Sequence, residues 1–111
     1  MQPVVRAVDV GFGYTKYVRH VDGNVITCNH FPSVAEASII DPAERSWGGP
    51  RDTIAVRVDK MFYEAGPDID LALGNFRPQL PRTDDYLRSP EYLALMRIAM
   101  DYMQVDTIDL L

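Results

Sequence analysis

The chain has 111 residues, 47% of them hydrophobic, and carries a formal net charge of −5 from 16 acidic and 11 basic side chains. That length and composition suit one small domain with an apolar core, and they exclude a chain that is disordered throughout. The acidic balance without a basic stripe argues against a direct nucleic-acid partner. No apolar run reaches the ~20 residues that span a bilayer. A single cysteine suits a cytoplasmic protein.

The first third of the chain predicts three antiparallel strands. Residues 4–10 are rich in valine, and residues 14–19 and 24–30 alternate in the way that strands do. Gly11 and Gly13 mark the first turn, and Asp22-Gly23 marks the second. Strands joined by such short turns form an antiparallel meander.

The middle of the chain predicts an irregular insert. Residues 31–50 contain several prolines and glycines, so we expect a loop with a short helical piece. Residues 53–58 and 61–65 alternate on either side of Asp59-Lys60 and predict a hairpin. The stretch that follows is irregular apart from an apolar patch at residues 69–73.

A helix begins near Ser89, which suits the N-cap because Pro90 and Glu91 come next. A core-facing stripe is predicted for the apolar residues at helical spacing: Tyr92, Leu93, Leu95, Met96, Ala99, Met100 and Met103. Residues 108–111 predict a further strand, reached by a helical crossover, so the fold class is α/β. A chain that closes on an apolar strand predicts a piece of a longer protein.

The stretch "VDVGFGYTK" places Asp9, Gly11, Gly13 and Lys16 around one turn. A phosphate needs converging backbone N–H groups that a Cβ would obstruct, and a lysine adds positive charge. An aspartate can hold Mg²⁺ through water. The spacing fits neither a Walker loop nor a dinucleotide fingerprint, because a strand pattern follows, and a plain hairpin without a ligand fits it equally well.

Four motifs together resemble the N-terminal domain of the actin-like ATPase superfamily. They are "AVDVGFGYTKY", "FPSVA", "FYEAGPDI" and "SPEYLALMRIAMDYM". More narrowly, they are similar to plasmid-segregation actins of the ParM/StbA type and to their relative, protein D of the PRTRC system. The resemblance implies the ribonuclease H-like first half of the actin-like fold, with residues 1–32 and 86–111 as the core subdomain and residues 33–85 as a small inserted subdomain.

The resemblance also implies a function, a nucleotide-dependent filament-forming protein of plasmid or DNA segregation that binds ATP or GTP with Mg²⁺. Asp9 would be the catalytic residue and would face the metal through water. The phosphates would be held by Gly11, Phe12, Gly13, Tyr14, Thr15 and Lys16. The partners would be further copies of the protein, in a filament or dimer, and an adaptor bound to centromere-like DNA, with no membrane contact.

The second phosphate loop of this superfamily lies beyond the end of the chain, so we expect ATPase activity in the longer protein and little in this chain alone. Two alternatives remain open. One is a small-molecule kinase of the same superfamily, and the other is a non-catalytic interaction domain with a plain glycine hairpin. Cys28 is expected to be a small buried strand residue rather than a nucleophile.

Overall fold

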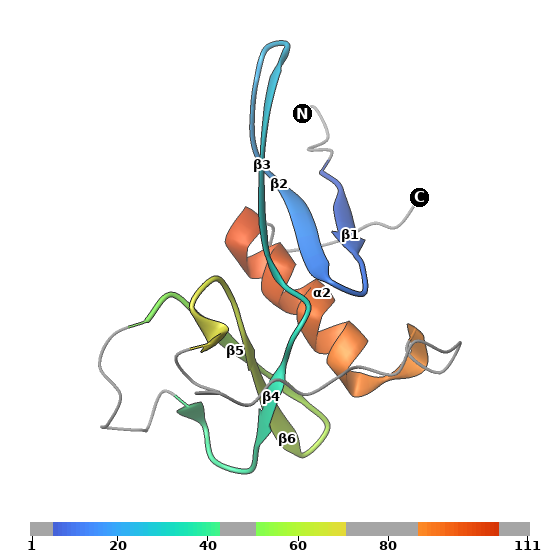
Figure 1. Cartoon of the computed structure of the whole chain (residues 1–111), viewed down its shortest axis with the longest axis vertical. Helices are drawn as coiled ribbons and strands as arrows, with labels where there is room; N and C mark the ends of the chain where they lie inside the picture. The colour runs from blue at the N-terminus through green and yellow to red at the C-terminus, as the bar shows by residue number, and fades with distance from the viewer. Residues whose placement is uncertain (1–5, 43–50, 71–86, 105–111) are drawn as a thin grey trace.

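The computed structural model describes residues 6–42, 51–70 and 87–104. It contains two three-stranded antiparallel sheets and a helix that packs against both (Figure 1). The first sheet has the order β1-β2-β3, from β1 (Val8–Val10), β2 (Tyr14–Asp22) and β3 (Val25–Pro32). The second has the order β4-β6-β5, from β4 (Glu36–Ser38), β5 (Ile54–Val58) and β6 (Met61–Ala65), and the helix is α2 (Pro90–Met103).

The first sheet confirms the predicted meander, with strands of different lengths. β1 begins at Val8, later than predicted, and residues 1–5 lie outside the described part of the chain. β2 and β3 pair along their lengths up to a turn at Gly23, whose φ is +59°. Beyond the sheet they form a two-stranded projection, residues 18–28, which we call the arm (Figure 1).

The second sheet contains one strand that the sequence does not predict. The hairpin of β5 and β6 is as expected, with Asp59 at φ +57° in its turn. Glu36–Ser38, expected to be loop, instead pairs with β6 as β4. Three residues carry no periodic pattern, and it is the partner strand that makes them a strand. The predicted strand at residues 108–111 and part of the patch at residues 69–73 lie outside the described residues.

Helix α2 begins as predicted, with the Ser89 side chain accepting a hydrogen bond from the Tyr92 N–H at 3.2 Å. Its buried stripe differs from the prediction, because Leu93 is 40% exposed and the two methionines in mid-helix are half-buried. The fully buried positions are Ala94, Leu95, Ile98 and Ala99. Alanines at these positions let the helix approach both sheets closely, and the methionines border the contact.

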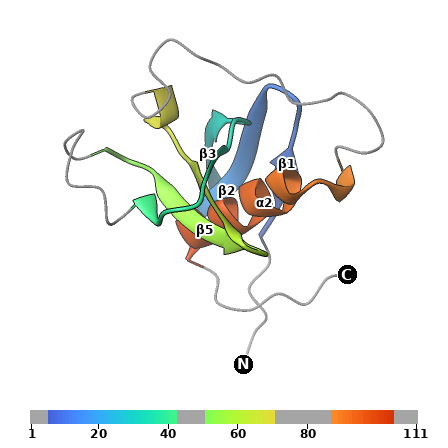
Figure 2. The ribbon, with the colours of Figure 1, turned by 90° about the horizontal axis from the view of Figure 1, so that it is seen from below.

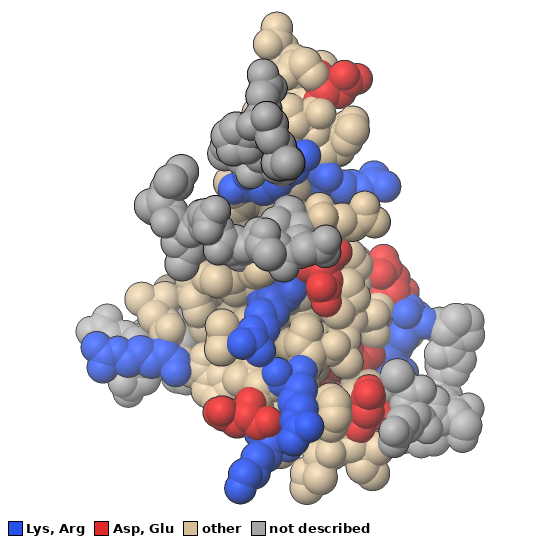
Figure 3. All heavy atoms as spheres, turned by 180° about the vertical axis from the view of Figure 1, so that it is seen from behind, with Lys and Arg blue, Asp and Glu red and all other residues tan. Residues whose placement is uncertain are grey.

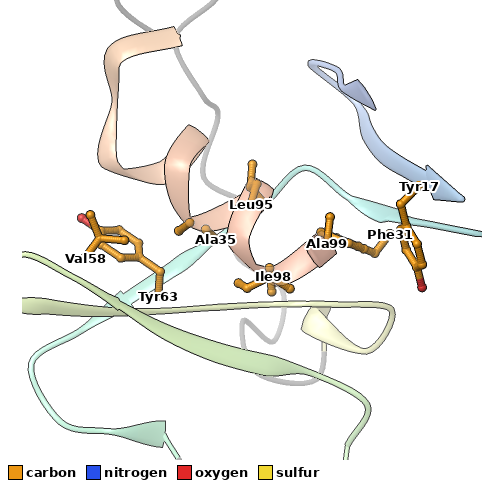
Figure 4. Close-up of a cluster of buried hydrophobic side chains, with 10 residues drawn as sticks. Tyr17, Phe31, Ala35, Val58, Tyr63, Leu95, Ile98 and Ala99 are labelled. Atoms are coloured by element: carbon orange, nitrogen blue, oxygen red, sulfur yellow. The ribbon is translucent and has the colours of Figure 1, made fainter. Parts of the chain in front are cut away.

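The core lies where α2 meets the two sheets. Leu95, Ile98 and Ala99 of the helix are fully buried, and Figure 4 shows them between residues of the first sheet and residues of the second. The cluster also contains Tyr17 and Phe31 from the first sheet, Val58, Tyr63 and Ala65 from the second, and Ala35 from the segment between β3 and β4. Figure 2 shows α2 running alongside the first sheet and β5. One helix therefore joins the two sheets through a continuous core.

Tyr102, near the end of α2, connects three parts of the fold. Its ring stacks on Tyr17 at 5.8 Å with an interplanar angle of 15°. Its hydroxyl donates a hydrogen bond to Asp52 Oδ1 at 2.9 Å. The Asp52 N–H in turn donates to Asp68 Oδ2 at 2.8 Å. Burial, and then the hydrogen bond to Asp52, raise the pKa of Tyr102 above its ordinary value.

The raised pKa of Tyr102 predicts a loss of stability in alkali. A group whose pKa is higher in the folded state than in the unfolded state stabilises the fold. That stability is fully present below the pKa of the unfolded chain, ~10 for tyrosine, and it is lost as the pH rises from there through the pKa of the folded state. We expect the free energy of unfolding to fall less steeply above pH ~10 in Tyr102→Phe than in the unaltered chain. Urea unfolding at a series of pH values measures this. Tyr14→Phe, at an exposed tyrosine, is the control, and equal slopes in all three proteins would contradict the prediction.

Candidate functional site

The glycine turn between β1 and β2 is closed by a hydrogen bond from the Gly11 N–H to the Tyr14 carbonyl at 3.1 Å. A Cβ added to Gly11 would lie 3.0 Å from that same oxygen, so the turn itself favours glycine there. A Cβ added to Gly13 would meet nothing within 4 Å. Neither residue has positive φ. The hairpin therefore accounts for Gly11, whereas Gly13 borders open space that a ligand could enter.

Two charged side chains face each other across this hairpin. Asp9 of β1 pairs with Lys16 of β2, and Lys16 pairs on its other side with His30 of β3. All three are exposed, and strand alternation places them on the sheet face opposite the buried Thr15 and Tyr17. Within the described ranges, neither Asp9 nor Lys16 forms an ion pair or a side-chain hydrogen bond. One open face thus carries a carboxylate and an ammonium that are both available to a ligand.

Two aromatic side chains lie beside this pair of charges. Phe12, at the tip of the turn, and Tyr14 are each 53% exposed. Tyr14 meets the His30 ring edge-on, with centroids 5.2 Å apart and an interplanar angle of 87°. The structure therefore places Tyr14 on the same open face as Lys16, with its ring held by a neighbour.

Thr15 points the other way. It is fully buried, and its hydroxyl hydrogen-bonds to that of Ser33 at 2.9 Å, where Ser33 is 2% exposed. Thr15 is one of the residues expected to hold the phosphates, and because its side chain is buried, a phosphate contact at Thr15 would use the backbone. The hydroxyl instead ties the turn to the segment that follows β3.

Ser33 supports the glycine turn from beneath. Besides its bond to Thr15, its N–H donates to the Gly13 carbonyl at 2.9 Å. Ser33 was not a predicted site residue, and no spacing signal could have identified it, because it lies 18 residues from Thr15. The two segments meet only because β3 pairs with β2 along its whole length and ends beside the turn.

Cys28 is exposed, which corrects the expectation that it is buried. It lies on the arm, where β2 and β3 have no covering layer among the described residues, so strand propensity there does not imply burial. No group of three or more His, Cys, Asp or Glu side chains suited to a metal ion occurs in residues 6–42, 51–70 and 87–104. Asp9 offers a cation one exposed carboxylate.

The exposed carboxylate of Asp9 beside Lys16 suits a hydrated magnesium ion bound together with a phosphate. Mg²⁺ keeps several waters and is commonly held by one or two carboxylates together with substrate phosphates. Asp9 offers one exposed carboxylate, and Lys16 offers a point charge for a phosphate oxygen.

No helix in the described residues combines the length and the apolar character needed to cross a membrane.

Residues 7–111 match a family model described as the N-terminal domain of actin-like proteins. The matched region includes the glycine turn, both sheets and α2. Neither the curated proteins nor the solved structures contain a match to this chain.

Proposed function

The chain belongs to the family of actin-like protein N-terminal domains, and from this premise we propose that its glycine turn binds the phosphates of ATP or GTP together with Mg²⁺. Asp9 would hold the metal through its water, and Lys16 would contact a phosphate oxygen. The backbone from Gly11 to Thr15 would approach the β- and γ-phosphates, with Phe12 and Tyr14 at the rim.

The observation that carries this proposal is the pairing of Asp9 with Lys16 on an open face beside Gly13. A plain hairpin needs the close contact at Gly11, but it does not need an uncommitted carboxylate and ammonium next to a glycine with free space. Backbone N–H groups and a lysine act on a phosphate by positioning and charge, which requires a rigid support. The buried Thr15–Ser33 hydrogen bond supplies such a support.

We further propose that the protein acts as a cytoplasmic, filament-forming actin of plasmid or DNA segregation of the ParM/StbA type, with an adaptor as its partner. The four sequence motifs support this narrower assignment. The other wall of the nucleotide site would come from residues outside this chain. Half of a phosphate clamp positions the γ-phosphate poorly, so hydrolysis by these 111 residues alone is expected to be very slow.

Asp9→Ala and Lys16→Ala are each expected to weaken binding of ATP with Mg²⁺ by about tenfold or more, the effect of losing one charge-assisted contact. Calorimetric titration measures this, on the 111-residue chain and on the complete protein that carries these residues. Unfolding curves should match those of the unaltered protein, because both side chains are exposed.

Matched controls are available within the chain. Lys60→Ala removes an exposed lysine in the turn after β5, and Asp22→Ala removes an exposed aspartate at the end of β2. Both should leave nucleotide affinity within about twofold of the unaltered protein. Full affinity in Asp9→Ala and Lys16→Ala would reject the site, and the turn would then be a hairpin only.

A further inference from the structure

The outer edge of β3 is unusual for a strand at the edge of a sheet. In the described residues β3 has only β2 as a neighbour, and its first six residues are all exposed. Three aliphatic side chains near the tip of the arm are also exposed: Val21 at 37%, Val25 at 65% and Ile26 at 61%. Figure 1 shows the arm projecting away from the two sheets and α2.

β3 itself also lacks the features that keep edge strands from pairing with other chains, and the one register shift in its ladder lies on the inner strand, between Val18 and His20 of β2. Edge strands are commonly protected by charged side chains, prolines or bulges. The β3 sequence VITCNHFP contains no Asp, Glu, Lys or Arg, and its one proline is its last residue. The charges of the hairpin are on the inner strand, at Lys16, Arg19 and Asp22. An isolated two-stranded ribbon is only marginally stable in water, so a further strand would stabilise the arm.

We propose that β3 pairs edge to edge with β3 of a second copy of this chain, antiparallel and about a two-fold axis. In such a pair each residue lies opposite a residue of the same short segment, so a charged side chain near the axis would face its own like charge. β3 carries no such charge, which suits self-pairing, whereas it offers no charge complementarity to a foreign peptide.

The charge distribution of the chain favours a contact at this place. Each chain has a net charge of −5, so two copies repel when their bodies approach. The arm, residues 18–28, carries one arginine and one aspartate, and Figure 3 shows its end almost free of basic residues. Contact through the projecting arms therefore joins an uncharged strand to its copy and keeps the acidic bodies apart.

This contact uses the same strand edge of both copies. Overlap of residues 25–29, centred on Thr27, would join two meanders into one sheet of order β1-β2-β3-β3-β2-β1, in which both β3 edges are used. Such an isologous contact gives a dimer and does not continue into a fibre. Cys28 would lie within one residue of the two-fold axis. The contact involves no nucleotide, so it stands or falls independently of the phosphate site.

Sedimentation velocity over a concentration series, without nucleotide, tests the pairing on the 111-residue chain and on two matched variants. Ile26→Lys places a charge on the edge strand. Val21→Lys places the same charge on the inner strand, at the position directly opposite in the hairpin. We expect the unaltered chain to form dimers. The dissociation constant of the dimer should rise by at least about tenfold in Ile26→Lys and should change by less than about threefold in Val21→Lys.

Cross-linking locates the contact. The chain has one cysteine, so a short bismaleimide can join two copies only through Cys28. Cross-linked dimers should form in the unaltered chain and in Val21→Lys, and should be largely lost in Ile26→Lys. A monomer at all concentrations, equal effects of the two lysines, or a dimer that Cys28 does not cross-link would each overturn the proposal. Circular dichroism melts confirm that both variants remain folded.

Discussion

Gly66→Ala is expected to lower the free energy of unfolding by more than about 3 kcal/mol. Gly66 follows β6 with φ of +147°, a conformation that side-chain-bearing residues rarely adopt. An added Cβ would lie 2.6 Å from the Tyr102 hydroxyl, 2.7 Å from the Asp52 carbonyl and 2.8 Å from the Thr53 Cα. Two of these three neighbours are backbone atoms, so the clash cannot be relieved by rotating a side chain.

The consequence extends beyond the turn, because this is where the end of α2 is bound to the second sheet. Displacing Asp52 breaks its hydrogen bond from Tyr102, the bond from its N–H to the Asp68 carboxylate and the bond that its carbonyl accepts from the Asp68 N–H. Loss of ~3 kcal/mol lowers the melting temperature of a domain of this size by more than about 10 °C. Thermal and urea unfolding measure the effect.

Gly13→Ala and Gly23→Ala are the matched controls for this substitution. Gly13 has room for a Cβ and no positive φ, so its variant should be within about 0.5 kcal/mol of the unaltered chain. Gly23 has φ of +59° and open space, so only the conformational cost of about 1 kcal/mol applies. A Gly66→Ala chain as stable as the Gly13→Ala chain would show that the loop before β5 can move away freely.

Glu64→Ala is expected to cost about 3 kcal/mol of folding free energy, because it leaves a largely buried arginine without its partner. Glu64 of β6 is 2% exposed. Arg51 donates to both of its oxygens, at 2.6 Å from Nε and 2.9 Å from Nη2, and the Thr53 hydroxyl donates to the same carboxylate. The hydrogen bond to Glu64 raises the pKa of Arg51, so this arginine remains charged.

A second glutamate provides the control. Glu36 lies directly opposite Glu64 in the β4–β6 ladder, and its Oε2 is buried without a hydrogen-bond partner among the described residues. Glu36→Gln removes a charge that repels Glu64 but attracts Arg51, so the free energy of unfolding should stay within about 0.5 kcal/mol of that of the unaltered chain. Replacing both members of the ion pair, as Arg51→Met with Glu64→Leu, should cost less than Glu64→Ala alone. Urea unfolding of the four proteins measures these differences, and equal effects of Glu64→Ala and Glu36→Gln would contradict the account.

Local chemistry was sufficient to predict much of this fold. The Ser89-Pro90-Glu91 start of α2, the meander and the hairpin of β5 and β6 follow from capping, alternation and turn residues, and they form as predicted. The four motifs, which are spread over residues 7–103, also indicate the actin-like family in combination, and residues 7–111 belong to that family. Each cap, turn and motif lies within a few neighbouring residues, so each of these signals is local.

What only the tertiary structure decided involves partners far apart in the chain. β4 is a strand because β6 lies beside it, and α2 buries its alanines rather than Leu93 because two sheets meet there. Ser33 reaches Thr15, and Arg51 reaches Glu64, through pairings that no spacing rule predicts. The sequence by itself determined the local elements and the family, since these depend on short-range geometry. The supports of the candidate site and the exposure of β3 and Cys28 were decided by packing, which depends on which surfaces the assembled sheets and helix leave covered or open.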